Sequence, residues 1–321
     1  MESPVIGVDI GGSVMRVGMF TPSGKILAKN QQLVEAHQGW RVGLRRLAGL
    51  IRQTWEEIGS PRFSGIGIGC TGPVDSMRGL IQNPYTLPTW ENVPIVQFLQ
   101  DEFGVPVTLE NDADAAALGE YWMGAGQGAQ RLYAITVGTG IGTACILDGR
   151  IYRGIGGAHP DGGHHIIEAS GPPCYCGANG CWESLASGAA IERVARARIA
   201  AETDSLIWGM IAGDVERLET RIIADAAFKG DSLACEIIQD AARYFSFGLI
   251  NVITLFVPEV IVLSGGVMNS LPLFMLAIEK AVRDHNVMVP AKQVRILPAQ
   301  LGEYAGLYGA AYSILQRIEN M

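Results

Sequence analysis

The sequence predicts an α/β protein made of two similar domains with a cleft between them. Apolar strands alternate with amphipathic helices along the chain, which is typical of layered α/β architectures. Residues 131–154 also repeat the pattern of residues 4–29, in which an apolar strand, a glycine-rich turn and two further strands follow one another. A chain of 321 residues is long for a single core, so we expect each copy of the pattern to open its own domain.

The first half of the chain contains the first copy of this pattern. Strands are expected over residues 4–9, 14–20 and 25–29. A helix begins near Leu44, because apolar residues then recur every three or four positions up to Ile58. Further along come a buried strand in "FSGIGIGCTGPVD", a helix over 93–103, a strand in "VPVTLEND" and a helix over 113–123.

The second half begins with the repeated pattern, whose last two strands are joined by a tight Asp148–Gly149 turn suited to a hairpin. Helices are then expected over 190–201, 233–255 and 274–284, strands in "EVIVLSGGV" and "VRILPA", and a last helix from Ala305. Small residues in the last helix favour close packing against a neighbour: Gly306, Gly309, Ala310 and Ala311. The domain boundaries fall near 113–125 and 295–305.

Composition excludes several classes of partner. The formal net charge is −8 and no run of lysine or arginine exceeds two residues, so we expect no nucleic-acid partner. The most apolar span, residues 245–263, is interrupted by Asn251, Pro258 and Glu259, which argues against a membrane crossing. The N-terminus enters a strand-like run directly, without the pattern of a secretory signal. We therefore expect a cytoplasmic protein with no membrane partner.

A cluster of cysteines predicts a metal site. Cys174, Cys176 and Cys181 fall within eight residues, and His164 and His165 lie about ten residues upstream. Zinc prefers four tetrahedral nitrogen and sulfur ligands, which this set supplies. The alternative, buried or disulfide-bonded cysteines, is weaker because a Cys174–Cys176 disulfide is sterically poor and a reducing compartment disfavours it. The same loop carries groups that can hydrogen-bond a polyol: Asp161, His164 and Glu183.

Glycine-rich turns follow three of the predicted core strands, at residues 9–13 ("DIGGS"), 138–142 ("GTGIG") and 264–267 ("SGGV"). Backbone amides that no side chain obstructs can cradle phosphate oxygens, so we predict a nucleotide site; plain tight turns are the alternative for each one singly. The predicted contacts are Asp9, Gly11, Gly12, Ser13, Gly138, Thr139, Gly140, Gly265 and Gly266. Asp9 is placed to hold Mg²⁺ beside the phosphates, with turn capping as its alternative role.

Asp112 is the predicted catalytic acid–base residue. It stands at a strand end directly before a helix, in "ENDADAAALGE", where Asn111 and the first helical amides can orient it. Phosphoryl transfer to an alcohol needs a base that accepts the hydroxyl proton while the phosphate is held in line. The alternative is an N-cap aspartate. Glu110 and Asp114 are given no functional role.

These motifs together resemble the ROK family (repressors, uncharacterised reading frames and sugar kinases) of the actin, hexokinase and Hsp70 superfamily. The resemblance covers essentially the whole chain: the three glycine turns, "TGPVD", "LENDADAAALGE" and the knuckle "CYCGANGCWESLASG". It implies two actin-like (ribonuclease H-like) domains, residues 1–118 completed by a C-terminal helix at about 303–321, and residues 119–302. It also implies Asp112 as general base, with Gly72, Asn111, Asp161, His164 and Glu183 at the sugar, and a structural Zn²⁺ on His164, Cys174, Cys176 and Cys181.

The resemblance predicts an ATP- and Mg²⁺-dependent hexose kinase of glucokinase type. Asp161 and Thr86 depart from the residues usual in glucose kinases of the family, so N-acetylmannosamine, N-acetylglucosamine, fructose, mannose and allose are alternative substrates. A sugar-sensing transcriptional regulator is the rival of another class; it needs a DNA-binding domain ahead of Asp9, for which eight residues are too few. Members of the family are commonly homodimers or homotetramers, which is the assembly we expect.

Overall fold

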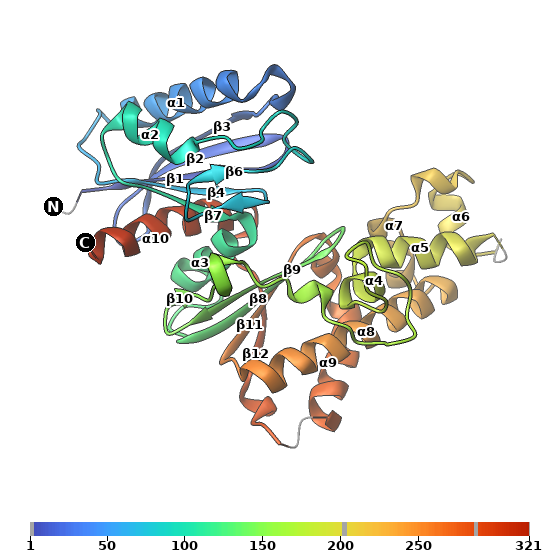
Figure 1. The fold of residues 1–321 in the computed structure, drawn as a ribbon. Coiled ribbons are helices and arrows are strands. Elements are labelled where there is room, and N and C mark those ends of the chain that lie inside the picture. Colours follow the sequence, from blue (N-terminus) through green and yellow to red (C-terminus); the bar gives the residue numbers. More distant parts are fainter. Residues whose placement is uncertain (1–2, 201–203, 286–287, 321) are drawn as a thin grey trace. The chain divides into compact units, whose positions relative to one another are not determined.

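A computed structural model describes residues 3–200, 204–285 and 288–320 (Figure 1). It confirms the α/β class. The chain forms two compact units, the first made of residues up to 130, 145–159 and 299 onward, and the second of residues 131–144 and 160–298.

The first sheet has the strand order β3-β2-β1-β4-β7. β1 pairs antiparallel with β2 but parallel with β4, and β4 pairs parallel with β7. Its strands are β1 (Val5–Ile10), β2 (Val14–Phe20), β3 (Ile26–Leu33), β4 (Ile66–Cys70) and β7 (Val107–Asn111). The hairpin at one side and the parallel strands at the other are the pattern expected from the opening residues, although β3 runs four residues further than predicted.

The second sheet repeats this topology in the order β10-β9-β8-β11-β12, with β11 parallel to both β8 and β12. Its strands are β8 (Arg131–Val137), β9 (Ile141–Leu147), β10 (Arg150–Ile151), β11 (Val260–Ser264) and β12 (Arg295–Pro298). Each sheet therefore begins with the same strand–turn–strand–turn–strand unit, which confirms the predicted repeat.

Helices cover both faces of the first sheet, α1 and α2 on one and α3 and α10 on the other (Figure 1). The helices are α1 (Trp40–Glu56), α2 (Ile95–Phe103), α3 (Asp112–Met123), α4 (Trp182–Ala186), α5 (Gly188–Ile199), α6 (Leu206–Met210), α7 (Thr220–Phe228), α8 (Ser232–Phe256), α9 (Leu271–His285) and α10 (Ala305–Glu319). Among the described residues, no helix is both long and apolar enough to cross a membrane.

Alternation of side chains along the strands explains why both faces of the first sheet are covered by helices. Ile6, Val8 and Ile10 point into the core under α1 and α2, whereas Val5 packs with Leu307 of α10 on the other face. Glycines on this second face let α10 lie directly on the sheet: a Cβ built on Gly67 would stand 1.7 Å from the carbonyl oxygen of Ala310.

Several element boundaries differ from the predictions for identifiable reasons. α1 starts at Trp40, four residues before the predicted Leu44. The prediction missed this first turn because it is only partly buried and shows little apolar periodicity. α4, α6 and α7 and a small hairpin of β5 (Val74–Asp75) and β6 (Leu80–Ile81) were not predicted, since most of these elements are too short to show a period. The last residue of the predicted helix 190–201 lies outside the described residues.

Glu120 of α3 links the helix to the chain that returns from the second unit. Its side chain is 2% exposed. Its carboxylate accepts hydrogen bonds from the backbone amides of Ala125 at 2.9 Å, Gln300 at 3.0 Å and Leu301 at 2.8 Å. A buried carboxylate needs such donors, and here they fix the segment that leads into α10.

We expect Glu120→Ala to lower the free energy of unfolding by about 2–4 kcal/mol, because it leaves three backbone amides without their acceptor. Chemical denaturation measures this. Glu56→Ala, on the exposed end of α1, is the matched control and should change stability by less than about 0.5 kcal/mol. An equal effect of the two substitutions would show that Glu120 does not anchor the segment.

Candidate functional site

The candidate site in the first unit lies where its parallel strands end. β1, β4 and β7 run parallel and end at Ile10, Cys70 and Asn111, so their carboxyl ends share one edge of the sheet. Asp9 and Asp112 thus reach the same edge. Ligands of open α/β sheets commonly bind at this edge, because the loops there are free to vary and backbone amides point outward.

Asp112 is the first residue of α3, and Asn111 is the N-cap. The Asn111 side chain accepts a hydrogen bond from the amide of Ala113 at 2.9 Å, and the Asp112 carboxylate accepts from the same amide at 2.9 Å. The alternative of Asp112 as the N-cap is therefore wrong, because Asn111 occupies that position. A Cβ on Gly72 would lie 2.5 Å from the side-chain Nδ2 of Asn111, so Gly72 and Asn111 are neighbours.

The electrostatics of this edge favour protonation of its acids. The Asp112 side chain is exposed at its surface, but surrounding protein removes enough water to raise the pKa of its carboxyl group; the Ala113 amide and the charge of His159 act in the opposite sense. The pKa of Asp9 is raised to about 6: burial is the largest cause, Arg16 acts in the opposite sense, and the charge of Asp112 adds to the rise. Arg16 lies 3.3 Å from Asp9 and 2.7 Å from Glu303.

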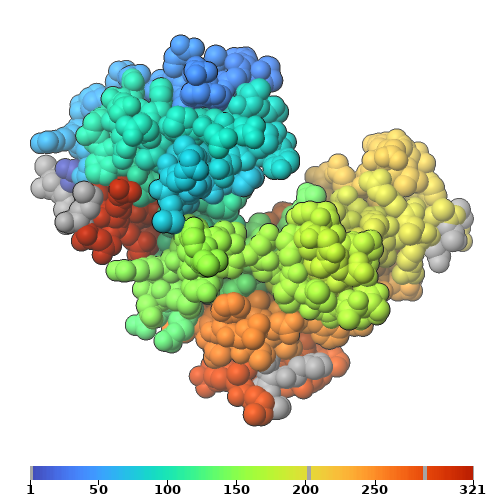
Figure 2. Space-filling view, viewed as in Figure 1, coloured from blue at the N-terminus to red at the C-terminus, as the bar shows by residue number. Residues whose placement is uncertain are grey.

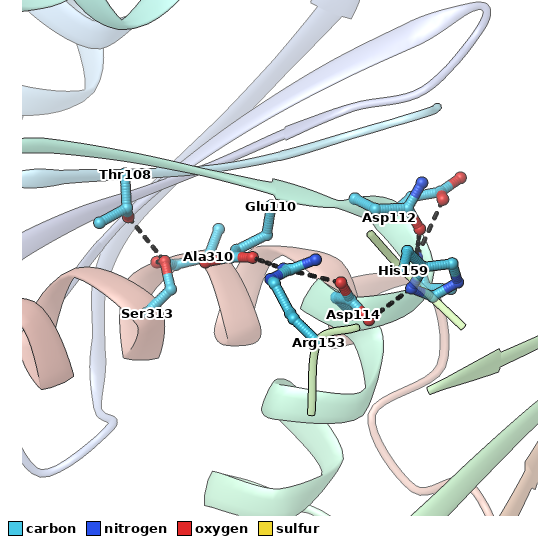
Figure 3. A network of polar contacts seen from close by, with 10 residues as sticks. Thr108, Glu110, Asp112, Asp114, Arg153, His159, Ala310 and Ser313 are labelled. Atoms are coloured by element: carbon cyan, nitrogen blue, oxygen red, sulfur yellow. Dashed lines mark hydrogen bonds and ion pairs between the residues drawn. The ribbon is translucent and has the colours of Figure 1, made fainter. Parts of the chain in front are cut away.

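A buried charge network adjoins Asp112 and was not predicted. Asp114, fully buried, forms an ion pair of 2.8 Å with Arg153 and lies 3.0 Å from Nδ1 of His159 (Figure 3). Arg153 also donates a hydrogen bond to Glu110. Glu110 and Asp114, to which no functional role was given, therefore belong to this network. Their partners are some 40 residues away in sequence, so no local pattern could have revealed them.

The candidate sugar loop of the second unit brings together acidic groups and a histidine. The Glu183 carboxylate accepts from the amide of Ile141 at 2.7 Å. His164 Nε2 lies 3.5 Å from Asp161 and 3.0 Å from the Tyr175 hydroxyl. Although Tyr175 as a whole is exposed, the protein around its hydroxyl removes some water, and this together with the charges of Glu183 and Asp161 raises the pKa of Tyr175 to about 12. Tyr175 was not predicted, and its place inside the cysteine knuckle is the one sequence signal for it.

The four predicted metal ligands converge in the second unit. The ligand atoms of His164, Cys174, Cys176 and Cys181 all lie within 4.8 Å of one another. Cys174 Sγ is 3.4 Å from His164 Nδ1, and Cys176 Sγ is 3.5 Å from Cys181 Sγ. Sulfurs on one tetrahedral zinc are separated by about 3.8 Å, so the set fits a single ion.

The surroundings of the cluster act differently on its thiols, since burial raises the pKa of Cys181 to about 12. Backbone amides, that of Ala178 first, lower the pKa of Cys176 and so favour its thiolate. None of the described cysteines forms a disulfide. His165 instead packs its ring against Trp182, with Nδ1 2.5 Å from the Gly162 carbonyl oxygen. The loop of residues 160–181 lies at the surface of the second unit (yellow-green in Figure 2), and Tyr175 is 83% exposed there.

A pocket of about 630 Å³ lies within the second unit. Gly138, Thr139 and Gly266 from two of the predicted phosphate turns line it. The starts of α5 and α7 form other walls, and Glu192 of α5 accepts hydrogen bonds from the amide and hydroxyl of Thr220 at 2.9 and 3.0 Å. The residues of α7 that line the pocket were not predicted, because the helix itself was not predicted.

The other residues that were predicted to contact phosphate do not line this pocket. A Cβ on Gly140 would stand 2.2 Å from the Glu183 carboxylate, so this glycine adjoins the sugar loop. Gly265, with φ of 92°, packs against the carbonyl of Val137 at the end of β8. Gly11, Gly12 and Ser13 form the turn between β1 and β2 in the first unit, closed by the hydrogen bond from the Gly11 amide to the Val14 carbonyl oxygen at 3.0 Å.

Two α/β units with the same strand order define a protein of the actin-like, two-domain class. The model of the ROK family matches residues 5–317, and the chain belongs to that family. It is 33% identical over 314 residues to a glucokinase of Thermotoga maritima, and the match covers 98% of each chain.

Solved structures agree with this assignment. A ROK hexokinase from Thermus thermophilus superposes with a TM-score of 0.84 at 32% identity, covering 99% of this chain and 100% of that one. A ROK family glucokinase from Streptomyces griseus, solved in complex with glucose and AMPPNP, superposes with a TM-score of 0.76 at 33% identity, covering 98% and 99%.

Proposed function

We propose that this chain is a sugar kinase that transfers the γ-phosphoryl group of ATP to the primary hydroxyl of a hexose, with glucose as the first candidate. The proposal rests on the environment of Asp112, a carboxylate that follows the carboxyl ends of three parallel strands and whose pKa is raised by loss of water. Full-length similarity to glucokinases and to a ROK hexokinase supports the same reaction.

In the proposed reaction Asp112 accepts the proton of the sugar hydroxyl as the oxygen attacks phosphorus. A carboxylate suffices for this step, because positioning and electrostatics lower most of the barrier to phosphoryl transfer. A raised pKa makes Asp112 a better proton acceptor, provided that it is ionised at the working pH. Asn111 and Gly72 fix the backbone around it and lie where a sugar hydroxyl can be bound.

We assign the remaining sugar contacts to Asp161, His164 and Glu183 of the second unit. A polyol presents several hydroxyl groups, each able to donate and to accept, and this set offers two carboxylates and a ring nitrogen. The Ile141 amide holds one oxygen of Glu183, which orients the carboxylate. Cys174 lies beside Nδ1 of His164, so a metal bound there would leave Nε2 to face the substrate.

We assign nucleotide binding to the pocket in the second unit. It combines two glycine turns, which suit phosphates, with apolar side chains such as Phe228 and Phe274, which suit a base. We assign Mg²⁺ to Asp9 of the first unit, because its carboxylate is an oxygen ligand of the kind that this ion prefers; without the ion, Arg16 lies 3.3 Å from it. When bound, Mg²⁺ would neutralise charge on the transferred phosphate.

We assign a structural role to zinc at His164, Cys174, Cys176 and Cys181. The ion would hold the chain from 164 to 181 in one conformation and so place His164 and Glu183 for substrate. The fit of the four ligand atoms to one tetrahedral ion supports this assignment.

The test of the proposed function is ADP formation by the purified chain with ATP and a panel of hexoses and N-acetylhexosamines. We expect glucose to be phosphorylated and Asp112→Asn to lower kcat by about 10²–10⁴-fold with little change in sugar affinity, because it removes the base but keeps the shape. Asp101→Asn, exposed on α2, is the matched control. Substantial activity in Asp112→Asn would refute the base, and a chain inactive on every sugar would refute the kinase.

Removal of zinc should loosen the sugar loop. We expect one zinc per chain by elemental analysis, and a melting temperature several degrees lower after chelation or in Cys176→Ser, because metal binding and folding are coupled. Cys235→Ser is the control, since that thiol belongs to α8 and contacts the carbonyl oxygen of Ala227. Equal melting temperatures with and without metal would contradict the assignment.

A further inference from the structure

Two basic side chains from one segment meet three acids at the start of α3. Arg153 and His159 both lie in residues 145–159, which belong to the first unit. They face Glu110 of β7 and Asp112 and Asp114 of α3 (Figure 3). Arg153 contacts Glu110 and Asp114, whereas His159 contacts Asp114 through Nδ1 at 3.0 Å.

Arg153 and His159 offset the cost of burying the Asp114 carboxylate. Its side chain is 1% exposed, and a buried carboxylate is costly unless it is paired. Oδ2 of Asp114 lies beside Arg153 and Oδ1 beside His159, so each carboxylate oxygen has one basic partner. The aspartate thereby fixes one ring nitrogen of His159 and favours the protonated imidazole.

We propose that His159 is a positioning residue for Asp112: held by Asp114, it keeps a positive charge beside the catalytic base and so keeps that base ionised and in place. The inference rests on the proposed function. Arg153 is engaged by Glu110, whose pKa burial raises to about 7, and by Asp114, so His159 is the basic group of this network whose charge acts on Asp112. Asp9 of β1 is the further acid whose charge is coupled to that of Asp112. In agreement, the charge of His159 lowers the pKa of Asp112.

Loss of the His159 charge should lower kcat at acid pH. A cation beside Asp112 favours its carboxylate, so loss of that cation raises the pKa of the base and moves the acid limb of kcat to higher pH. At high pH both His159 in the wild type and its neutral replacement lack charge, and Asp112 is ionised in both. The difference between the two enzymes therefore grows as the pH falls and vanishes as it rises.

The test compares His159→Asn with His159→Ala across pH, following ADP formation at saturating ATP with the best sugar of the wild-type chain. Asparagine keeps an N–H donor near the position of Nδ1 but cannot carry the charge. We expect His159→Asn to keep the wild-type melting temperature and a sugar KM within about twofold. Its acid limb should shift upward by about one pH unit, which costs up to about tenfold in kcat below pH 6 and little above pH 8.5.

A merely structural role gives a different result. If His159 serves only to hydrogen-bond Asp114, His159→Asn will follow the wild-type pH profile and only His159→Ala will lose stability, which overturns the proposal. His37→Asn, in the exposed turn η1 (Ala36–Gln38), controls for loss of a histidine elsewhere in the same unit. Failure of the kinase assignment is seen separately, as a wild-type chain that forms no ADP with any sugar, and it would overturn this inference with it.

Discussion

Pairing of the buried Asp114 carboxylate is the interaction on which the candidate site depends. The carboxylate lies in the first turn of α3, two residues beyond Asp112, and Arg153 and His159 pair with it in the interior of the protein. Both follow β10 in the chain, within the segment 145–159 that belongs to the first unit. One buried charge therefore links the start of α3 to Arg153 and His159 of the same unit.

The rest of the first unit holds α3 in the position that this pairing requires. α3 and α10 approach so closely that a Cβ on Gly119 would lie 2.1 Å from the carbonyl oxygen of Ala305, and one on Gly309 would lie 1.6 Å from that of Ala115. Glu120, at the far end of the helix, binds the amides of Gln300 and Leu301. A helix so confined keeps its first residue at a fixed place on the sheet edge, which is what a positioned base needs.

Local patterns in the sequence were sufficient to predict much of this. Apolar strands of period two followed by glycine turns gave both copies of the opening hairpin, and the place of Asp112 between a strand and a helix identified the candidate base. Contacts between distant residues were not predictable from such patterns. Asp114 meets His159 across 45 residues, Tyr175 meets His164 through the fold of the knuckle, and the pocket wall on α7 has no distinctive motif. The cysteine spacing is an intermediate case, because it indicates a metal but does not choose between His164 and His165.

The most direct measurement of the central claim is a crystal structure of the chain with glucose and a non-hydrolysable ATP analogue. The account predicts an Asp112 carboxylate oxygen within about 2.6–3.2 Å of the primary hydroxyl oxygen of the sugar, with His159 still bound to Asp114. A sugar whose primary hydroxyl is bound by another residue, with the Asp112 carboxylate turned away from it, would contradict the account.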